Sequence, residues 1–283
     1  MHNCEAKCFN QADAENFAKV RPSCFLLPVG LLLAIAFFLY KEDALNIDSY
    51  RQIQKGAFYY VNSRLSQFPN LEFNLTQLGD ALVLLSFLTI FIIRRPKIWE
   101  HLITSSLVSL LITFVLKTFF SVPRPAATFN NSSFTIIGDT LTCNNSLPSG
   151  HTITIFTTLT VLMYGFMPKA LKNRILWCLF IMATGLFIAL SRVAVGAHYP
   201  LDVLIGSIVG YICGITGILV CQKYNLWGWI CERKYYPIFI GLFLICCFVL
   251  ITKITSNNLF IFYLSIVSLA FSSYVFTKAC IKR

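Results

Sequence analysis

The chain has 283 residues, of which 57% are hydrophobic and only 12% charged, and its formal net charge is +11. Soluble domains are about 45 to 50% apolar and about 25% charged, so this composition excludes a soluble globular fold. The 26 Phe and the scarcity of charge also exclude an intrinsically disordered chain. We therefore expect an all-α, polytopic membrane bundle, with the bilayer as a partner and no nucleic acid partner.

Eight apolar stretches approach the roughly 20 residues that a bilayer-spanning helix needs. They lie near Cys24–Tyr40, Leu75–Ile93, Leu102–Ser121, His151–Met167, Ile175–Ser191, Leu201–Cys221, Tyr236–Thr252 and Asn258–Phe276. We predict a cytoplasmic N-terminal segment (1–21), a six-span core (22–222) and a C-terminal two-helix extension (223–283). The first stretch contains Ala34-Ile35-Ala36, which resembles a signal-peptide cleavage site, but the apolar run continues past it and favours a retained span.

Lys and Arg alternate between the connecting segments. The segments before the first span, after the second, fourth and sixth, and after the eighth carry three each, which is 15 of the 23 cations. By the positive-inside rule these segments are cytoplasmic, so both termini lie inside and the longer loops, 41–74 and 122–150, lie outside. If the cell is bacterial, the outer loops face the periplasm from the inner membrane.

The 11 Cys do not predict a disulfide framework or a metal site. In this topology only Cys143 falls in an outer loop, and most of the others lie inside spans, where Cys is a small apolar residue. No Cys and His cluster has metal-ligand spacing, so we expect no metal and no cofactor.

The two outer loops each leave an alternative open. Residues 41–77 mix apolar and charged side chains, which suits an interfacial helix, although a packed helix covering the end of the bundle is favoured. Residues 122–150 are too many for a simple connection, and they form either a lid over a site or a passive surface loop.

Three polar motifs interrupt the apolar pattern, and ionisable groups at a span are functional candidates because burying them is costly. The first motif ends the third span with Lys117, followed by Pro123-Arg124-Pro125, where the prolines restrict the backbone. Taken alone, this motif is better explained by Lys117 as a side chain that snorkels to the interface and Arg124 as an ordinary loop residue. The second motif, Ser149-Gly150-His151, opens the fourth span, where free backbone N–H groups and the helix dipole attract anions; a helix-capping Ser is the alternative.

The third motif runs from Ser191-Arg192 to His198 and Asp202, between the fifth and sixth spans. If Pro200 lies in the first turn of a helix, Asp202 can reach one ring nitrogen of His198 and leave the other free as nucleophile or base. A structural His and Asp pair is the alternative. Helix parity places all three motifs on the outer face, so three cations surround two imidazoles, an arrangement that suits phosphate.

The three motifs together resemble the signature of the type 2 phosphatidic acid phosphatase (PAP2) superfamily. They match it as Lys117, six residues and Arg124-Pro125, then Pro148-Ser149-Gly150-His151, then Ser191-Arg192, five residues, His198, three residues and Asp202. The resemblance implies that His198 attacks phosphorus and forms a phosphohistidine, that Asp202 holds its ring, and that His151 protonates the leaving oxygen and later activates water.

The same resemblance implies a phosphate-binding set of Lys117, Arg124, Ser149, Gly150 and Arg192, acting without metal. The expected activity is hydrolysis of a phosphate monoester or diphosphate head group of a membrane lipid. Undecaprenyl diphosphate, phosphatidylglycerol phosphate, phosphatidate and lipid A phosphate all fit as substrates. Two alternatives remain, a lipid phosphotransferase with the same site and a transporter of phosphorylated solutes, whose binding residues would usually lie nearer the bilayer midplane.

Overall fold

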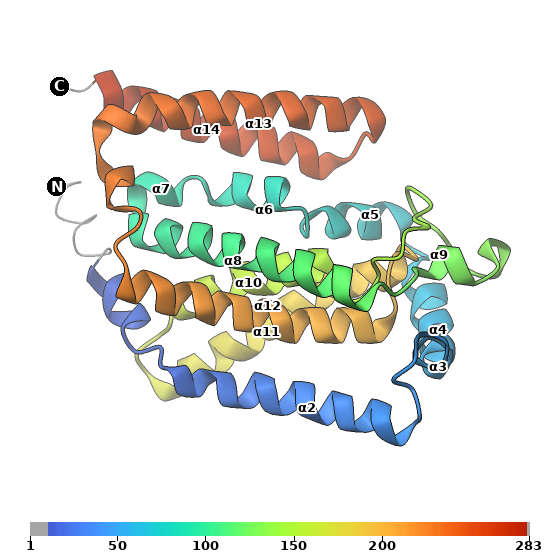
Figure 1. Ribbon diagram of the computed structural model, residues 1–283. Helices are drawn as coiled ribbons and strands as arrows, with labels where there is room; N and C mark the ends of the chain where they lie inside the picture. The colour runs from blue at the N-terminus through green and yellow to red at the C-terminus, as the bar shows by residue number, and fades with distance from the viewer. Residues whose placement is uncertain (1–10, 282–283) are drawn as a thin grey trace.

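The computed structural model describes residues 11–281, and all of the regular secondary structure in that range is helical. The all-α fold class is therefore confirmed. The α-helices, numbered as in Figure 1, are α2 (Leu26–Lys41), α3 (Ile47–Ile53), α4 (Lys55–Leu65), α5 (Pro69–Gln77), α6 (Ala81–Leu88), α7 (Phe91–Arg94), α8 (Pro96–Phe120), α9 (Pro125–Thr128), α10 (Gly150–Gly165), α11 (Leu171–Ala194), α12 (Pro200–Lys223), α13 (Tyr236–Ser256) and α14 (Phe260–Ile281).

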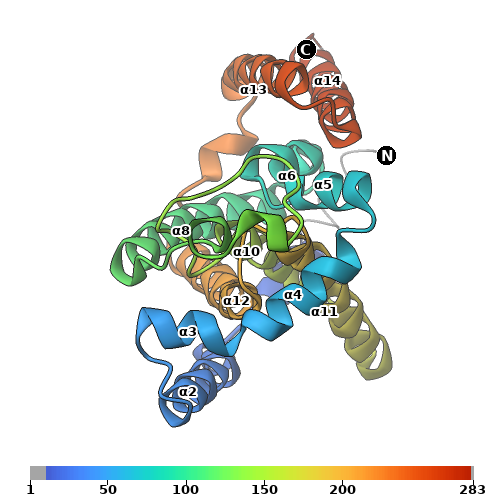
Figure 2. The ribbon, with the colours of Figure 1, turned by 90° about the vertical axis from the view of Figure 1, so that its right-hand side faces the viewer.

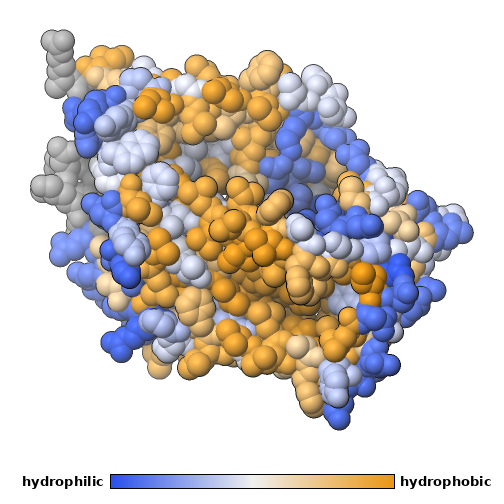
Figure 3. Space-filling model, in the orientation of Figure 1, coloured by the Kyte–Doolittle hydropathy of each residue, from blue (hydrophilic) through white to orange (hydrophobic). Residues whose placement is uncertain are grey.

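Within residues 11–281, six helical segments are long and apolar enough to cross a membrane. They are built on α2, α8, α11, α12, α13 and α14. The surface carries a broad apolar band across the middle of the molecule with polar residues gathered toward both ends (Figure 3). This distribution is the one a bilayer-spanning bundle requires, because its lipid-facing side chains must be apolar.

Two of the eight expected spans differ from the prediction. The second is not one straight helix, because α5 and α6 meet at an angle of 71°. Leu78, Gly79 and Asp80 form a turn there, and the Asp80 carboxylate accepts a hydrogen bond from the backbone N–H of Leu82, which starts α6. The fourth expected span, α10, has only 16 residues and lies largely buried inside the bundle.

Small residues on α12 let it approach α10 closely. A Cβ atom at Gly210 would lie 2.6 Å from the carbonyl oxygen of Ile153, and one at Gly206 would lie 2.9 Å from that of Ser149. Close packing through glycine is a common means of joining helices in membranes. It brings the N-terminal ends of α10 and α12, which carry the second and third motifs, next to each other.

The three motifs lie at one end of the bundle, and the connections α7 to α8, α10 to α11 and α12 to α13 lie at the other (Figure 1). Helices α3 and α4 run across the motif end (Figure 2). Tyr50 of α3 and Phe58 of α4 are buried there, so residues 41–77 contain the packed covering helix that was favoured. At the opposite end, Phe17 of the N-terminal segment stacks on His101; residues 1–10, Lys282 and Arg283 lie outside the described residues.

Helix α2 packs loosely against the remainder of the bundle, and most of its large apolar side chains are exposed. An apolar cavity of about 960 Å³ separates it from α11 and α12, lined by residues such as Leu31, Ile35, Leu179 and Leu204. Leu201 of the third motif is one of the lining residues, but none of the charged or His residues of the three motifs lines this cavity. The cavity therefore borders the third motif without containing the polar side chains described next.

Candidate active site

The charged residues of the three motifs lie at or next to helix ends. Lys117 lies in the last turn of α8, which stops at Ser121 in the left-handed conformation (φ 46°). Arg124 is the N-cap residue of α9, and Arg192 lies in the last turn of α11. Asp202 lies in the first turn of α12, with Pro200 at the helix start as expected. The structure therefore assembles residues from three separate motifs at helix termini, where orphan backbone groups are also available.

His198 lies between α11 and α12 and is fully buried. Its Nδ1 is 3.4 Å from Oγ of Ser146 and 3.5 Å from Oδ2 of Asp202, whereas its Nε2 is buried and has no hydrogen-bond partner among the described residues. Burial, with further contributions from Arg124 and Arg192, lowers the pKa of His198 well below its usual value. The imidazole is therefore neutral near pH 7, and one of its nitrogens is unoccupied.

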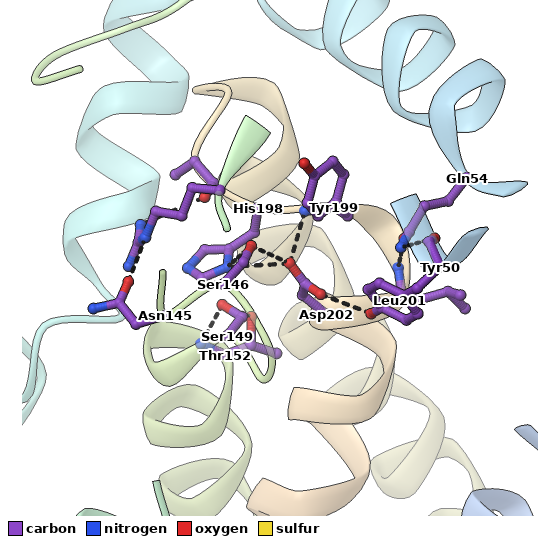
Figure 4. A network of polar contacts seen from close by, with 12 residues as sticks. Tyr50, Gln54, Asn145, Ser146, Ser149, Thr152, His198, Tyr199, Leu201 and Asp202 are labelled. Atoms are coloured by element: carbon purple, nitrogen blue, oxygen red, sulfur yellow. Dashed lines mark hydrogen bonds and ion pairs between the residues drawn. The ribbon is translucent and has the colours of Figure 1, made fainter. Parts of the chain in front are cut away.

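Asp202 is a neighbour of His198 but not its direct hydrogen-bond partner, because 3.5 Å exceeds an ordinary hydrogen bond. Its Oδ2 accepts from Oγ of Ser146 (2.5 Å) and from the backbone N–H of Tyr199 (3.0 Å), and its Oδ1 accepts from the hydroxyl of Tyr50 (2.7 Å) (Figure 4). Asp202 is thus held by three donors, and Ser146 lies between it and the imidazole.

Tyr50 and Ser146 were not identified from the sequence. Tyr50 is 152 positions away from Asp202 in a separate helix, and only the packing of α3 across the bundle end brings them together. Ser146 is one of several Asn and Ser residues in the loop before the second motif, and no periodicity distinguishes it.

Three cations surround the imidazoles. Arg124 is buried; its Nε donates to Oδ1 of Asn145 (2.7 Å) and its NH1 to the carbonyl oxygen of Ala197 (3.4 Å). Arg192 is buried too, with NH1 donating to Oγ1 of Thr76, while its Nε has no hydrogen-bond partner among the described residues. Nζ of Lys117 would lie 3.4 Å from a Cβ at Gly150. The cations retain hydrogen-bonding capacity toward a ligand between them.

Ser149 caps α10, which is the alternative that the sequence left open. Its hydroxyl accepts from the backbone N–H and the hydroxyl of Thr152, and its own N–H donates to the carbonyl oxygen of Asp202 (3.1 Å). Its backbone N–H is therefore already used, and a contact between its hydroxyl and phosphate stays a prediction. Gly150 and His151 follow it in the first turn, where helix N–H groups have no carbonyl four residues back in the helix.

His151 lies against the bend between α5 and α6. A Cβ atom at Gly79 would be 2.5 Å from Cβ of His151 and 2.9 Å from its Cδ2, so only glycine fits at position 79 in this arrangement. The ring therefore has a defined position set partly by a segment outside the three motifs.

The loop of residues 122–150 is held against α4. Phe129 and Phe134 pack on the ring of Phe58, and Asn62 exchanges hydrogen bonds with the backbone of Thr135. The backbone N–H of Ser146 donates to the carbonyl oxygen of Val122 (2.8 Å). These contacts join the two outer loops into one layer over the motif end, and whether this layer opens as a lid stays a prediction.

Across residues 11–281, no group of three or more His, Cys, Asp and Glu side chains is arranged to hold a metal ion. The site instead combines a buried neutral imidazole, a fixed carboxylate and three cationic side chains at one end of a membrane bundle. That combination defines a helical membrane protein equipped for phosphate chemistry.

Comparison with protein families identifies the class more closely. Residues 99–227 match the family model of the PAP2 superfamily, so the chain contains a PAP2 superfamily domain, and this match indicates a phosphatase. The domain runs from α8 to the end of α12 and includes all three motifs. Among solved structures, LpxE from Aquifex aeolicus is similar, with 28% sequence identity over 61% of this chain and 96% of that chain and a TM-score of 0.49. A search of curated proteins gave no match.

Proposed function

We propose that the protein hydrolyses the phosphate monoester or diphosphate head group of a membrane lipid through a phosphohistidine on His198. The observation that carries this proposal is the buried, unpartnered Nε2 of His198, which lies beside three cations. A neutral imidazole with one free nitrogen is a nucleophile, and the cations supply the attraction that a phosphate group needs.

In the first step the Nε2 lone pair attacks phosphorus, and the bond from phosphorus to the lipid oxygen breaks. His151, once protonated, gives its proton to that leaving oxygen. In the second step His151 takes a proton from water, the water oxygen attacks phosphorus, and the N–P bond breaks and returns the lone pair to Nε2. Free phosphate and the dephosphorylated lipid are the products.

We propose that Asp202 acts on His198 through Ser146. We propose that Nδ1 of His198 carries the proton and donates to Oγ of Ser146, because the hydrogen of that hydroxyl is donated to Asp202. This arrangement fixes the tautomer that leaves Nε2 unprotonated and favours the positive charge that the ring acquires on phosphorylation. Ser146 and Tyr50 are therefore proposed as positioning residues for the nucleophile.

The phosphoryl oxygens are proposed to bind Lys117, Arg124, Arg192 and the backbone N–H at Gly150. Removal of a single preorganised donor of this kind from an enzyme typically lowers kcat by about 10² to 10³. Because the site lies at the end of apolar helices, a lipid tail remains in the bilayer while the head group enters the site. We propose the outer face of the membrane, which in a bacterium is the periplasmic face of the inner membrane, since the opposite end carries the excess of Lys and Arg.

The test is phosphate release by purified full-length protein from a panel of lipid phosphates in detergent micelles, comparing wild type with His198→Ala. We expect release by wild type, with or without EDTA, and none by the variant. Labelled phosphate should be trapped on His198 as an acid-labile adduct. Trapping on His151 instead would overturn the assigned roles. Transfer of the labelled phosphoryl group to an added lipid acceptor, with no free phosphate released in its absence, would indicate a phosphotransferase.

A further inference from the structure

The bend between α5 and α6, which we call the elbow (residues 74–80), contacts two of the proposed site residues. Oγ1 of Thr76 accepts a hydrogen bond from NH1 of Arg192. Gly79 lies so close to His151 that a Cβ atom would come within 2.5 Å of the His151 Cβ. Displacement of the elbow would therefore move a proposed phosphate ligand and the proposed proton donor together.

The opposite side of the elbow is bound by the hairpin of α13 and α14. Nζ of Lys253 in α13 donates to Oδ2 of Asp80 at 2.5 Å, while Oδ1 of the same carboxylate caps α6. The backbone N–H of Ile261 donates to Oδ1 of Asn74 at 3.0 Å. The elbow is consequently attached to the hairpin near both of its ends.

The hairpin is also joined to α6 at greater depth. The hydroxyls of Thr89 and Ser272 are 2.7 Å apart, and Oγ of Ser268 donates to the carbonyl oxygen of Ser86 at 3.0 Å. A single hydrogen bond between membrane helices contributes little stability, so several of them are needed to fix one helix against another. These hydrogen bonds hold α14 and α6 against each other next to the elbow.

We propose that Asp80 and Lys253 are positioning residues that link the α13–α14 hairpin to the catalytic centre. The hairpin lies outside the PAP2 superfamily match, and the link gives it a role in the reaction: it fixes the elbow, and the elbow fixes Arg192 and His151. Neither Asp80 nor Lys253 belongs to the proposed phosphate-binding set. This inference rests on the proposed function, because it concerns the same site.

The ion pair is partly exposed, with side-chain exposures of 35% for Lys253 and 23% for Asp80, so its loss should affect geometry more than stability. The chain offers a matched control in the pair between Lys234 and Glu232, which is 2.6 Å long, exposed and remote from the elbow. Comparison of Lys253→Met with Lys234→Met therefore distinguishes the loss of the contact with the elbow from the general effect of removing one positive charge.

The experiment measures phosphate release from phosphatidate micelles by full-length wild type, Lys253→Met, Asp80→Asn, the double variant and Lys234→Met. We expect Lys253→Met and Asp80→Asn each to lower kcat about fivefold, because a small misplacement of catalytic groups raises the activation barrier. The double variant should be no worse than either single variant. The pH profile of kcat should also shift, since the surroundings of His151 change. Lys234→Met should match wild type.

A second measurement separates this inference from the proposed function. Inorganic phosphate should raise the Tm of wild type by binding at the site, and Lys253→Met should weaken its apparent Kd about fivefold even if no tested lipid is a substrate. Gly79→Ala acts on the elbow without touching the hairpin, and it should lower kcat and weaken phosphate binding in the same way. If Lys253→Met and Asp80→Asn bind phosphate like wild type and share its kcat and pH profile, the inference is overturned, whatever the result for Gly79→Ala.

Discussion

Replacing Tyr50 with Phe removes one hydroxyl from the contacts of Asp202 and tests how the nucleophile is held. Tyr50 donates to Oδ1 of Asp202 at 2.7 Å, and both side chains are buried. Burial, followed by the neighbouring carboxylate, raises the pKa of Tyr50 well above its usual value, so the hydroxyl stays a donor over the whole working range of pH. Deleting it leaves the buried Oδ1 without that hydrogen bond.

A hydrogen bond to a charged group contributes about 1.5 to 3 kcal/mol. Asp202 keeps two further donors, Ser146 and the backbone of Tyr199, so we expect only part of that energy to appear in the barrier. A loss of about 1.4 kcal/mol corresponds to a tenfold lower kcat. The KM should remain within about twofold, because Tyr50 is not in the proposed phosphate-binding set.

The assay is steady-state phosphate release from a lipid phosphate that wild type hydrolyses, with Tyr59→Phe as the control. Tyr59 lies on the neighbouring helix α4, and its hydroxyl contacts Ser133 outside the site, so its removal should leave kcat unchanged. Equal kcat values for Tyr50→Phe, Tyr59→Phe and wild type would refute the argument that Tyr50 positions the nucleophile. A rise in KM at constant kcat would show instead that the hydroxyl contributes to substrate binding.

Three further predictions concern pH, packing and sidedness. The pKa of His198 is depressed in the folded state, so below the ordinary His pKa of about 6.5 the unfolded chain binds a proton at this residue and the folded chain does not. The wild type should therefore lose about 1.4 kcal/mol of stability per pH unit below 6.5 relative to His198→Ala. The Tm of wild type should fall more steeply between pH 6.5 and 5, and parallel Tm curves for the two proteins would contradict this prediction. Gly206→Ala should lower Tm and kcat, since its Cβ would lie 2.9 Å from the carbonyl oxygen of Ser149 and overpacking costs about 1 to 3 kcal/mol, whereas Gly241→Ala has nothing within 4 Å and should do neither. A membrane-impermeant thiol reagent should label the exposed Cys143 on intact cells and Cys280 only after permeabilisation; the reverse pattern would invert the topology.

Much of the site could be predicted because charge is scarce in this chain. A bilayer excludes unpaired charges, so Lys117, Arg124, Arg192 and Asp202 were conspicuous, and helix parity alone put their motifs at one end of the bundle. The position of Pro200 at the start of α12 also followed from local chemistry, since proline suits the first turn.

The remaining features depend on tertiary packing or on competing local roles. A Ser before a helix predicts a cap and an anion site equally well. The structure shows that Ser149 is a cap, since its Oγ accepts from the N–H of Thr152 and its N–H donates to the carbonyl oxygen of Asp202, and a contact with phosphate stays a prediction. The elbow was missed because hydropathy stays high from Leu75 to Ile93, and a window average hides the break at Gly79 and Asp80.

The shortness of α10 has a consequence for the surroundings of the protein. A helix of 16 residues is about 24 Å long, whereas the hydrocarbon layer of a bilayer is about 30 Å thick. The first turn of α10, with Gly150 and His151, therefore cannot reach the surface of an ordinary bilayer when its other end lies at the opposite surface. Either the head group descends or the lipid layer thins locally. We therefore expect the acyl-chain length of the host membrane to affect access to the proposed nucleophile, independently of the head group.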